Sequence, residues 1–158
     1  MTPANSIEYF IQSYGDLLFD LCESVLVSPM NAQIAFRSIL KKIRAGRRLH
    51  KFRTYERNWV LRIACDLLLK FSREFGHHVS PEEQIKLDSN SSVKIRFKEF
   101  DSYFHRLMPE DQLLLLLKDK LEIPYSEISV AMSIPEGSLK VRRQQALRAL
   151  EEWLWNSK

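Results

Sequence analysis

Between Tyr125 and Arg142 the chain carries the stretch YSEISVAMSIPEGSLKVR, which decides the expected fold. Residues 125–132 suit a helix of about two turns, residues 133–137 interrupt it with a proline and a glycine, and residues 138–155 suit a longer helix. Such an arrangement predicts a helix-turn-helix unit. The apolar positions expected to hold its helices together are Ile128, Ala131, Ile134, Leu139, Ala146 and Leu150. Gly137 is expected in the turn, where a bulky replacement would damage the backbone.

The second helix of this unit carries side chains that suit contact with DNA. Amides hydrogen-bond to base edges, whereas lysine and arginine neutralise phosphates. The residues expected at DNA are Ser138, Lys140, Arg142, Arg143, Gln144 and Arg148. Helix pairs with this spacing also occur as purely structural units, so the pattern alone leaves both interpretations open.

The rest of the chain also has a helical pattern, which predicts an all-α fold. Glycine is scarce, with four in 158 residues, and apolar residues recur at three- and four-residue steps. Ser28-Pro29 separates a first helix from a second, and a third is expected from about Tyr55 to Gly76. We therefore expect two small helical domains, 1–76 and 96–158, joined by a polar linker over 77–95.

Charge is distributed unevenly along the chain. Residues 1–30 contain four acidic side chains and no lysine or arginine, whereas residues 31–73 contain twelve basic and two acidic side chains, a local net charge of 12 − 2 = +10. A local excess of this kind is typical of a surface that meets phosphates. The alternative is a set of solvated helix faces.

Several functional classes find no support in the sequence. No apolar run reaches the roughly 18 to 20 residues that span a bilayer, and the first ten residues lack the basic and apolar regions of a signal peptide. Cys22 and Cys65 are expected as buried, reduced thiols of a cytoplasmic protein. His77 and His78 have no cysteine or carboxylate at ligand spacing, so neither a metal nor a cofactor is expected. No nucleophile elbow or phosphate-binding loop is present, which argues against an enzyme.

Linked motifs over about fifty residues resemble region 4 of the extracytoplasmic-function subfamily of bacterial sigma factors. These are Leu107-Met108-Pro109-Glu110-Asp111-Gln112, then Tyr125-Ser126-Glu127-Ile128-Ser129, then Ile134-Pro135-Glu136-Gly137-Ser138-Leu139-Lys140-Val141-Arg142 with Ala146 and Ala149-Leu150. The resemblance implies that the second helix of the unit contacts the minus-thirty-five promoter element through Ser138, Lys140 and Arg142. Gln144 and Arg148 are added from helix geometry.

The N-terminal block is similar to region 2 of the same family. Trp59, Ile63 and Ala64 match the helix that opens the minus-ten element, although Asp66 stands where the family has an asparagine. The resemblance implies partners, namely promoter DNA, core RNA polymerase and an anti-sigma factor. The residues expected at a single strand are Arg53, Arg57, Asn58 and Arg62, and those expected at the polymerase are Gln33, Ile34 and Arg37.

Residues 31–38 differ from the family in a way that supports a second hypothesis. The family carries an acidic helix here with a glutamine, whereas this chain has no acid and has Arg37 in place of the glutamine. Arg143 and Gln145 also replace a usual leucine and arginine in the last helix. The first hypothesis is an alternative sigma factor. The second is a sigma-derived regulator or adaptor that no longer docks on the polymerase.

Overall fold

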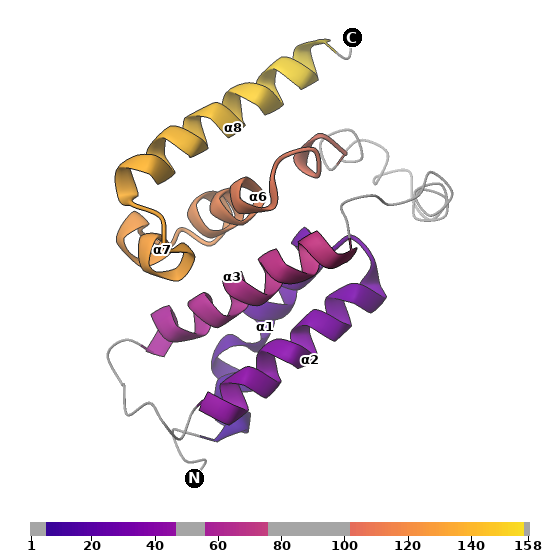
Figure 1. The fold of residues 1–158 in the computed structure, drawn as a ribbon, viewed down its shortest axis with the longest axis vertical. Helices are drawn as coiled ribbons and strands as arrows, with labels where there is room; N and C mark the ends of the chain where they lie inside the picture. Colours follow the sequence, from indigo (N-terminus) through magenta and orange to yellow (C-terminus); the bar gives the residue numbers. More distant parts are fainter. Residues whose placement is uncertain (1–5, 47–55, 76–101, 157–158) are drawn as a thin grey trace.

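The protein was examined as a computed structural model, which describes residues 6–46, 56–75 and 102–156. These residues confirm the all-α prediction, because they form helices and turns with no strand. Figure 1 shows their arrangement. The helices are α1 (Ile7–Val25), α2 (Pro29–Gly46), α3 (Glu56–Phe75), α6 (Pro109–Leu115), the π-helix η1 (Leu116–Lys120), α7 (Tyr125–Met132) and α8 (Glu136–Asn156). The predicted linker over 77–95 lies outside the described residues.

Capping hydrogen bonds define where the first two helices begin. The amide of Tyr9 donates to the Ser6 hydroxyl at 3.2 Å, which caps α1. Ser28 does the same for α2 by accepting from the amide of Asn31 at 3.4 Å, and Pro29 is the first residue of that helix, where proline is tolerated. The predicted break at Ser28-Pro29 is therefore confirmed as the connection of a helical hairpin.

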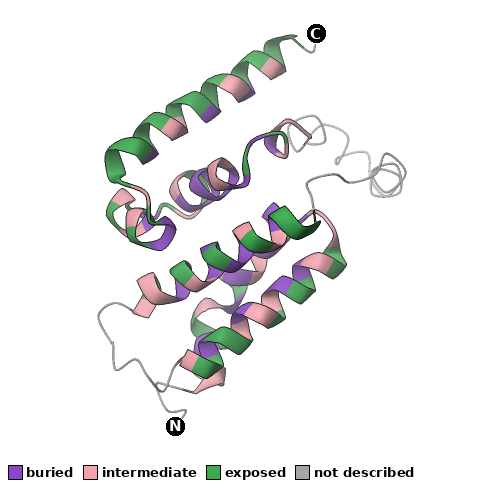
Figure 2. Ribbon diagram, viewed as in Figure 1, coloured by how far each residue is buried: buried purple, intermediate pink, exposed green. Residues whose placement is uncertain are grey.

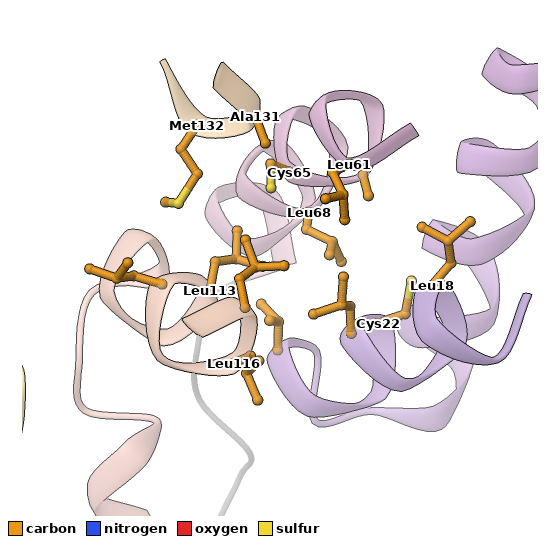
Figure 3. Packing of buried hydrophobic residues seen from close by; sticks show 14 of the residues in the cluster. Leu18, Cys22, Leu61, Cys65, Leu68, Leu113, Leu116, Ala131 and Met132 are labelled. Atoms are coloured by element: carbon orange, nitrogen blue, oxygen red, sulfur yellow. The ribbon is translucent and has the colours of Figure 1, made fainter. Parts of the chain in front are cut away.

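Helix α3 packs on both sides of the molecule. It contacts α1 and α2 on one side and α6 and α7 on the other. Its side chains Leu61, Cys65 and Leu68 lie among residues of α1, α6 and α7 in Figure 3, and all three are fully buried. The buried apolar residues of the described helices consequently form one hydrophobic cluster. Cys22 and Cys65 belong to it as free thiols, which confirms their predicted burial.

A carboxylate joins the start of α3 to α1. The hydroxyls of Tyr9 and Tyr14 each donate to Oε1 of Glu56 at 2.8 Å. Burial, followed by the hydrogen bond to Glu56, raises the pKa of Tyr14. These hydrogen bonds fix the end of α3 from which the predicted single-strand residues Arg57 and Asn58 project.

The segment before the helix-turn-helix unit contains a π-helix. The amide of Leu121 donates to the carbonyl of Leu116, five residues earlier, at 2.9 Å. Glu122 then takes a left-handed conformation with φ 55°. The side-chain amide of the buried Gln112 donates to the Leu107 carbonyl at 2.8 Å and holds the chain that leads into α6.

Ion pairs connect the two blocks that the sequence predicts as domains. Lys120 pairs with Asp20 of α1 at 3.0 Å, and Arg73 of α3 pairs with Glu110 of α6 at 2.9 Å. The Lys120–Asp20 pair is exposed, so it contributes less than about 1 kcal/mol to stability, whereas in the other pair Arg73 is exposed and Glu110 is partly buried. The shared apolar core is therefore the main source of stability between the blocks, and their independence as domains stays a prediction.

Candidate nucleic-acid interface

The turn between α7 and α8 is closed by one residue of α7. The carbonyl of Ser129 accepts from the amide of Ser133, and also from the amide of Ile134 at 3.2 Å. Its hydroxyl donates to the carbonyl of Ile134 at 2.6 Å. Ser133 has φ 56°, the left-handed conformation that ends many helices. The unit thus has an eight-residue helix, a three-residue turn and a 21-residue helix.

Gly137 does not have the role that the sequence predicted. It lies inside α8, which begins at Glu136, and a Cβ atom built on it meets no atom within 4 Å. The prediction that places Gly137 in the turn is therefore wrong, and neither its backbone nor the space around its Cα requires a glycine. Ser133 supplies the left-handed residue instead, and its backbone amide donates to the carbonyl of Ser129.

The apolar positions predicted to join the two helices do so. Ile128 and Ala131 of α7 are buried, as are Leu139, Ala146 and Leu150 of α8. Ile134 in the turn is partly buried against the same cluster. The buried stripe of α8 faces α6 and α7, which are the helices it contacts most. This packing fixes which side of α8 is presented to solvent.

The solvent-facing side of α8 carries four of the predicted DNA residues. Ser138, Lys140, Gln144 and Arg148 are all exposed. Figure 2 shows this helix green along the side away from α6. Val141, 53% exposed, lies among them and provides an apolar surface next to the amide and the cations. In a major groove, an apolar side chain of this kind contacts the methyl group of thymine.

Unlike these four residues, Arg142 and Arg143 bind carboxylates of neighbouring helices. Nε of Arg142 lies 2.8 Å from Oδ1 of Asp111 on α6, and both side chains are partly buried. Nη2 and Nε of Arg143 contact the carboxylate of Asp119 at 2.6 and 3.0 Å, and this hydrogen bonding raises the pKa of Arg143. In this arrangement the two arginines connect α8 to α6 and η1.

Arg57, one of the predicted single-strand residues, contacts the helix-turn-helix unit. Nη2 of Arg57 on α3 is 2.6 Å from Oε2 of Glu127 on α7. The buried Oδ1 of the neighbouring Asn58 has no hydrogen-bond partner in the described part of the chain. Arg62 is exposed on the same helix, and Arg53 lies outside the described residues. Arg57 and Glu127 are 70 residues apart, so the sequence pattern held no signal for their contact.

The predicted polymerase-contacting residues share the outer side of α2. Gln33, Ile34 and Arg37 are exposed, and Ile34 has 41% of its surface accessible. Lys41, Lys42 and Arg44 continue the exposed surface toward the end of the helix. None of these four cations forms an ion pair with another described residue. Figure 1 places α2 and α8 on opposite sides of the molecule, so the two surfaces are separate.

Other site types find no support in the described helices. No group of three His, Cys, Asp or Glu side chains within them is placed to bind a metal ion. None of these helices has the length and apolar character needed to cross a membrane. His77 and His78 lie outside the described residues.

Trp153 packs at the far end of α8. Its ring centroid lies 6.2 Å from that of Tyr103, and the guanidinium of Arg106 lies 4.8 Å from the Tyr103 ring centroid. These contacts hold the C-terminal part of α8 against the segment that precedes α6.

In comparisons with known proteins, no family model matches the chain, and no curated protein is significantly similar to it.

Proposed function

We propose that this chain is a cytoplasmic DNA-binding protein that acts in transcription initiation, namely an alternative sigma factor that binds core RNA polymerase and directs it to promoters. The observation that carries the proposal is the α7–turn–α8 unit, whose long second helix is held by a buried stripe while its other side stays in solvent. An exposed helix with amides, cations and a small apolar side chain has the chemistry needed to enter a major groove.

Within this proposal the predicted DNA residues of α8 divide into two groups. Lys140, Gln144 and Arg148 meet DNA directly, because they are exposed and free of carboxylate partners among the described residues. Arg142 and Arg143 already pair with carboxylates, so their first role is to orient α8. An alanine at Arg142 would remove an ion pair of the fold as well as any DNA contact, which makes it an ambiguous probe.

Duplex binding tests the role of α8 without knowledge of the promoter. A fluorescently labelled duplex of random sequence is titrated with the wild type, Lys140→Ala and Arg148→Ala at several salt concentrations. Each variant is expected to reduce the slope of log affinity against log salt by about one, since one phosphate contact is lost. Lys70→Ala removes an exposed cation of α3 and serves as the matched control. Equal binding by all four proteins would refute the assignment of α8.

Polymerase binding separates the sigma factor from the second hypothesis, a sigma-derived regulator that has lost polymerase docking. The observation that favours this alternative is the exposed outer side of α2, which has cations and no acidic residue. Core RNA polymerase is mixed with the wild type and with Ile34→Asp, and co-elution is measured by size exclusion. Co-elution that Ile34→Asp abolishes supports the sigma factor. If the folded wild type fails to co-elute at micromolar concentration, the regulator is the better assignment.

A further inference from the structure

Helices α1 and α2 present opposite charges on their outer sides. The exposed acids of α1 are Glu8, Asp16 and Glu23, and this helix contains no lysine or arginine. The exposed cations of α2 are Arg37, Lys41, Lys42 and Arg44, and this helix contains no acid. No ion pair joins α1 to α2 among the described residues. The charges of the hairpin are therefore available to an external partner.

The spacing of these charges matches between the two helices. Glu8 and Asp16 are eight residues apart, about 12 Å along the axis, and Arg37 and Arg44 are seven residues apart, about 10.5 Å. The helices pack against each other as consecutive elements joined by a short connection, so they run antiparallel. A second hairpin related by a two-fold axis along the helices would place its α1 over this α2, and its α2 over this α1.

We propose that the outer side of the α1–α2 hairpin is a contact between two copies of this chain. In the dimer, α1 of each copy packs on α2 of the other. The two hairpins then form an antiparallel four-helix arrangement of two layers. Charge complementarity selects a second copy as the occupant, because the same hairpin supplies both the acids and the cations. Ile11 and Ile34, 44% and 41% exposed, contribute apolar surface that association removes from water.

This inference goes beyond the proposed function and does not depend on it. The dimer covers Gln33, Ile34 and Arg37, which are the residues predicted to dock on the polymerase. A copy within the dimer is then unable to use this surface for the polymerase, so dilution or a competing partner would be needed to release it.

The test is a measurement of mass in solution with nucleic-acid-free protein. Sedimentation of the full chain at increasing concentration is expected to show a rise from 18.7 kDa toward twice that value at about 0.1 M salt. At about 1 M salt the Debye length falls from about 10 Å to about 3 Å, and the dimer is expected to dissociate. A chain that stays monomeric at low salt over the whole concentration range would overturn the proposal.

Charge reversal identifies the interface. Glu8→Lys with Asp16→Lys, or Arg37→Glu with Arg44→Glu, should each give monomers, since like charges then face each other. All four changes together should restore the dimer, because α1 is then basic and α2 acidic. This variant keeps the net charge of +4, since two acids and two bases are exchanged. Circular dichroism checks that each variant is folded.

A matched control reverses charges elsewhere. Lys70→Glu with Arg148→Glu, on α3 and α8, makes the same change in net charge as Arg37→Glu with Arg44→Glu and should leave the dimer intact. It is a control for dimerisation alone, because Arg148 is among the residues proposed to meet DNA. A dimer that survives both hairpin reversals, or a fourfold variant that stays monomeric although it is folded, would overturn the proposal. If the wild type is itself monomeric at low salt and Arg37→Glu with Arg44→Glu lowers its affinity for DNA, the proposal is overturned and the cations of α2 are assigned to phosphates.

Discussion

Leu68 lies in α3 where the two halves of the molecule meet, and its side chain is fully buried. Leu68→Ala removes three carbons from this core, which costs about 2.4 kcal/mol in transfer free energy at about 0.8 kcal/mol each. The cavity left behind adds to this cost, so the free energy of unfolding should fall by about 2.7 to 5 kcal/mol. For a chain of this length, the melting temperature should fall by about 5 to 20 °C.

The assay follows unfolding at both ends of the molecule. Trp59 on α3 reports the N-terminal block in a variant with Trp153→Phe and Trp155→Phe. The tryptophans of α8 report the C-terminal block in a variant with Trp59→Phe. Because one core connects the helices, Leu68→Ala should shift both fluorescence transitions by the same amount. Leu147→Ala, at a side chain 38% exposed on α8, is the matched control and should cost less than about 1 kcal/mol.

Separate responses of the two probes would refute this reasoning. If Leu68→Ala lowered the midpoint reported by Trp59 and left the midpoint from α8 unchanged, the blocks would unfold independently. The chain would then consist of two domains in the thermodynamic sense, as the sequence predicts.

Four further predictions follow, two from the thiols and two from the glycines. Burial raises the pKa of Cys22 and Cys65 from 9.0 to about 12, so the folded state holds their protons more tightly. The stabilisation from these protonated thiols is complete below about pH 9 and is lost as the pH rises toward 12, by about 1.4 kcal/mol per pH unit for each thiol. Denaturant melts across this pH range measure the free energy of unfolding, and a free energy that does not change with pH would contradict the prediction. Both thiols should react with a thiol reagent slowly in the folded protein and rapidly in denaturant, and fast reaction of the native protein would refute their burial. Gly137→Ala should raise stability by up to about 1 kcal/mol, since the residue is helical and has open space. Gly46→Ala should instead lower it by about 1 to 3 kcal/mol, because the new Cβ would lie 2.7 Å from Cζ2 of Trp59; thermal melts of the two variants should move in opposite directions.

Much of the fold was predictable because local signals agree with the packing. Ser28-Pro29 is a cap followed by a residue that suits the first turn of a helix, so the break between α1 and α2 follows from the chain itself. The apolar spacing of α7 and α8 identified the buried positions correctly, with Ile128 and Leu139 among them. A side chain that recurs every three or four residues has the same orientation in any helix, whatever the helix packs against.

The turn of the helix-turn-helix unit shows where local signals fail. A glycine was expected to provide its unusual backbone conformation, yet Ser133 does so and Gly137 is helical. The hydrogen bonds from Ser133 and Ile134 back to Ser129 select this conformation. The π-helix at Leu116–Lys120 was likewise not predicted, because a shift from four- to five-residue hydrogen bonds has no distinct apolar period over a single turn.

The sequence by itself determined that the described chain is helical, which faces of its helices are apolar, and where acids and cations concentrate along it. These are properties of short segments, and they survive without knowledge of the partners. Only the tertiary structure decided which cations face solvent, because the carboxylates that bind Arg57, Arg142 and Arg143 come from other helices. Pairings across 24 to 70 residues depend on how helices pack, and no local pattern encodes them.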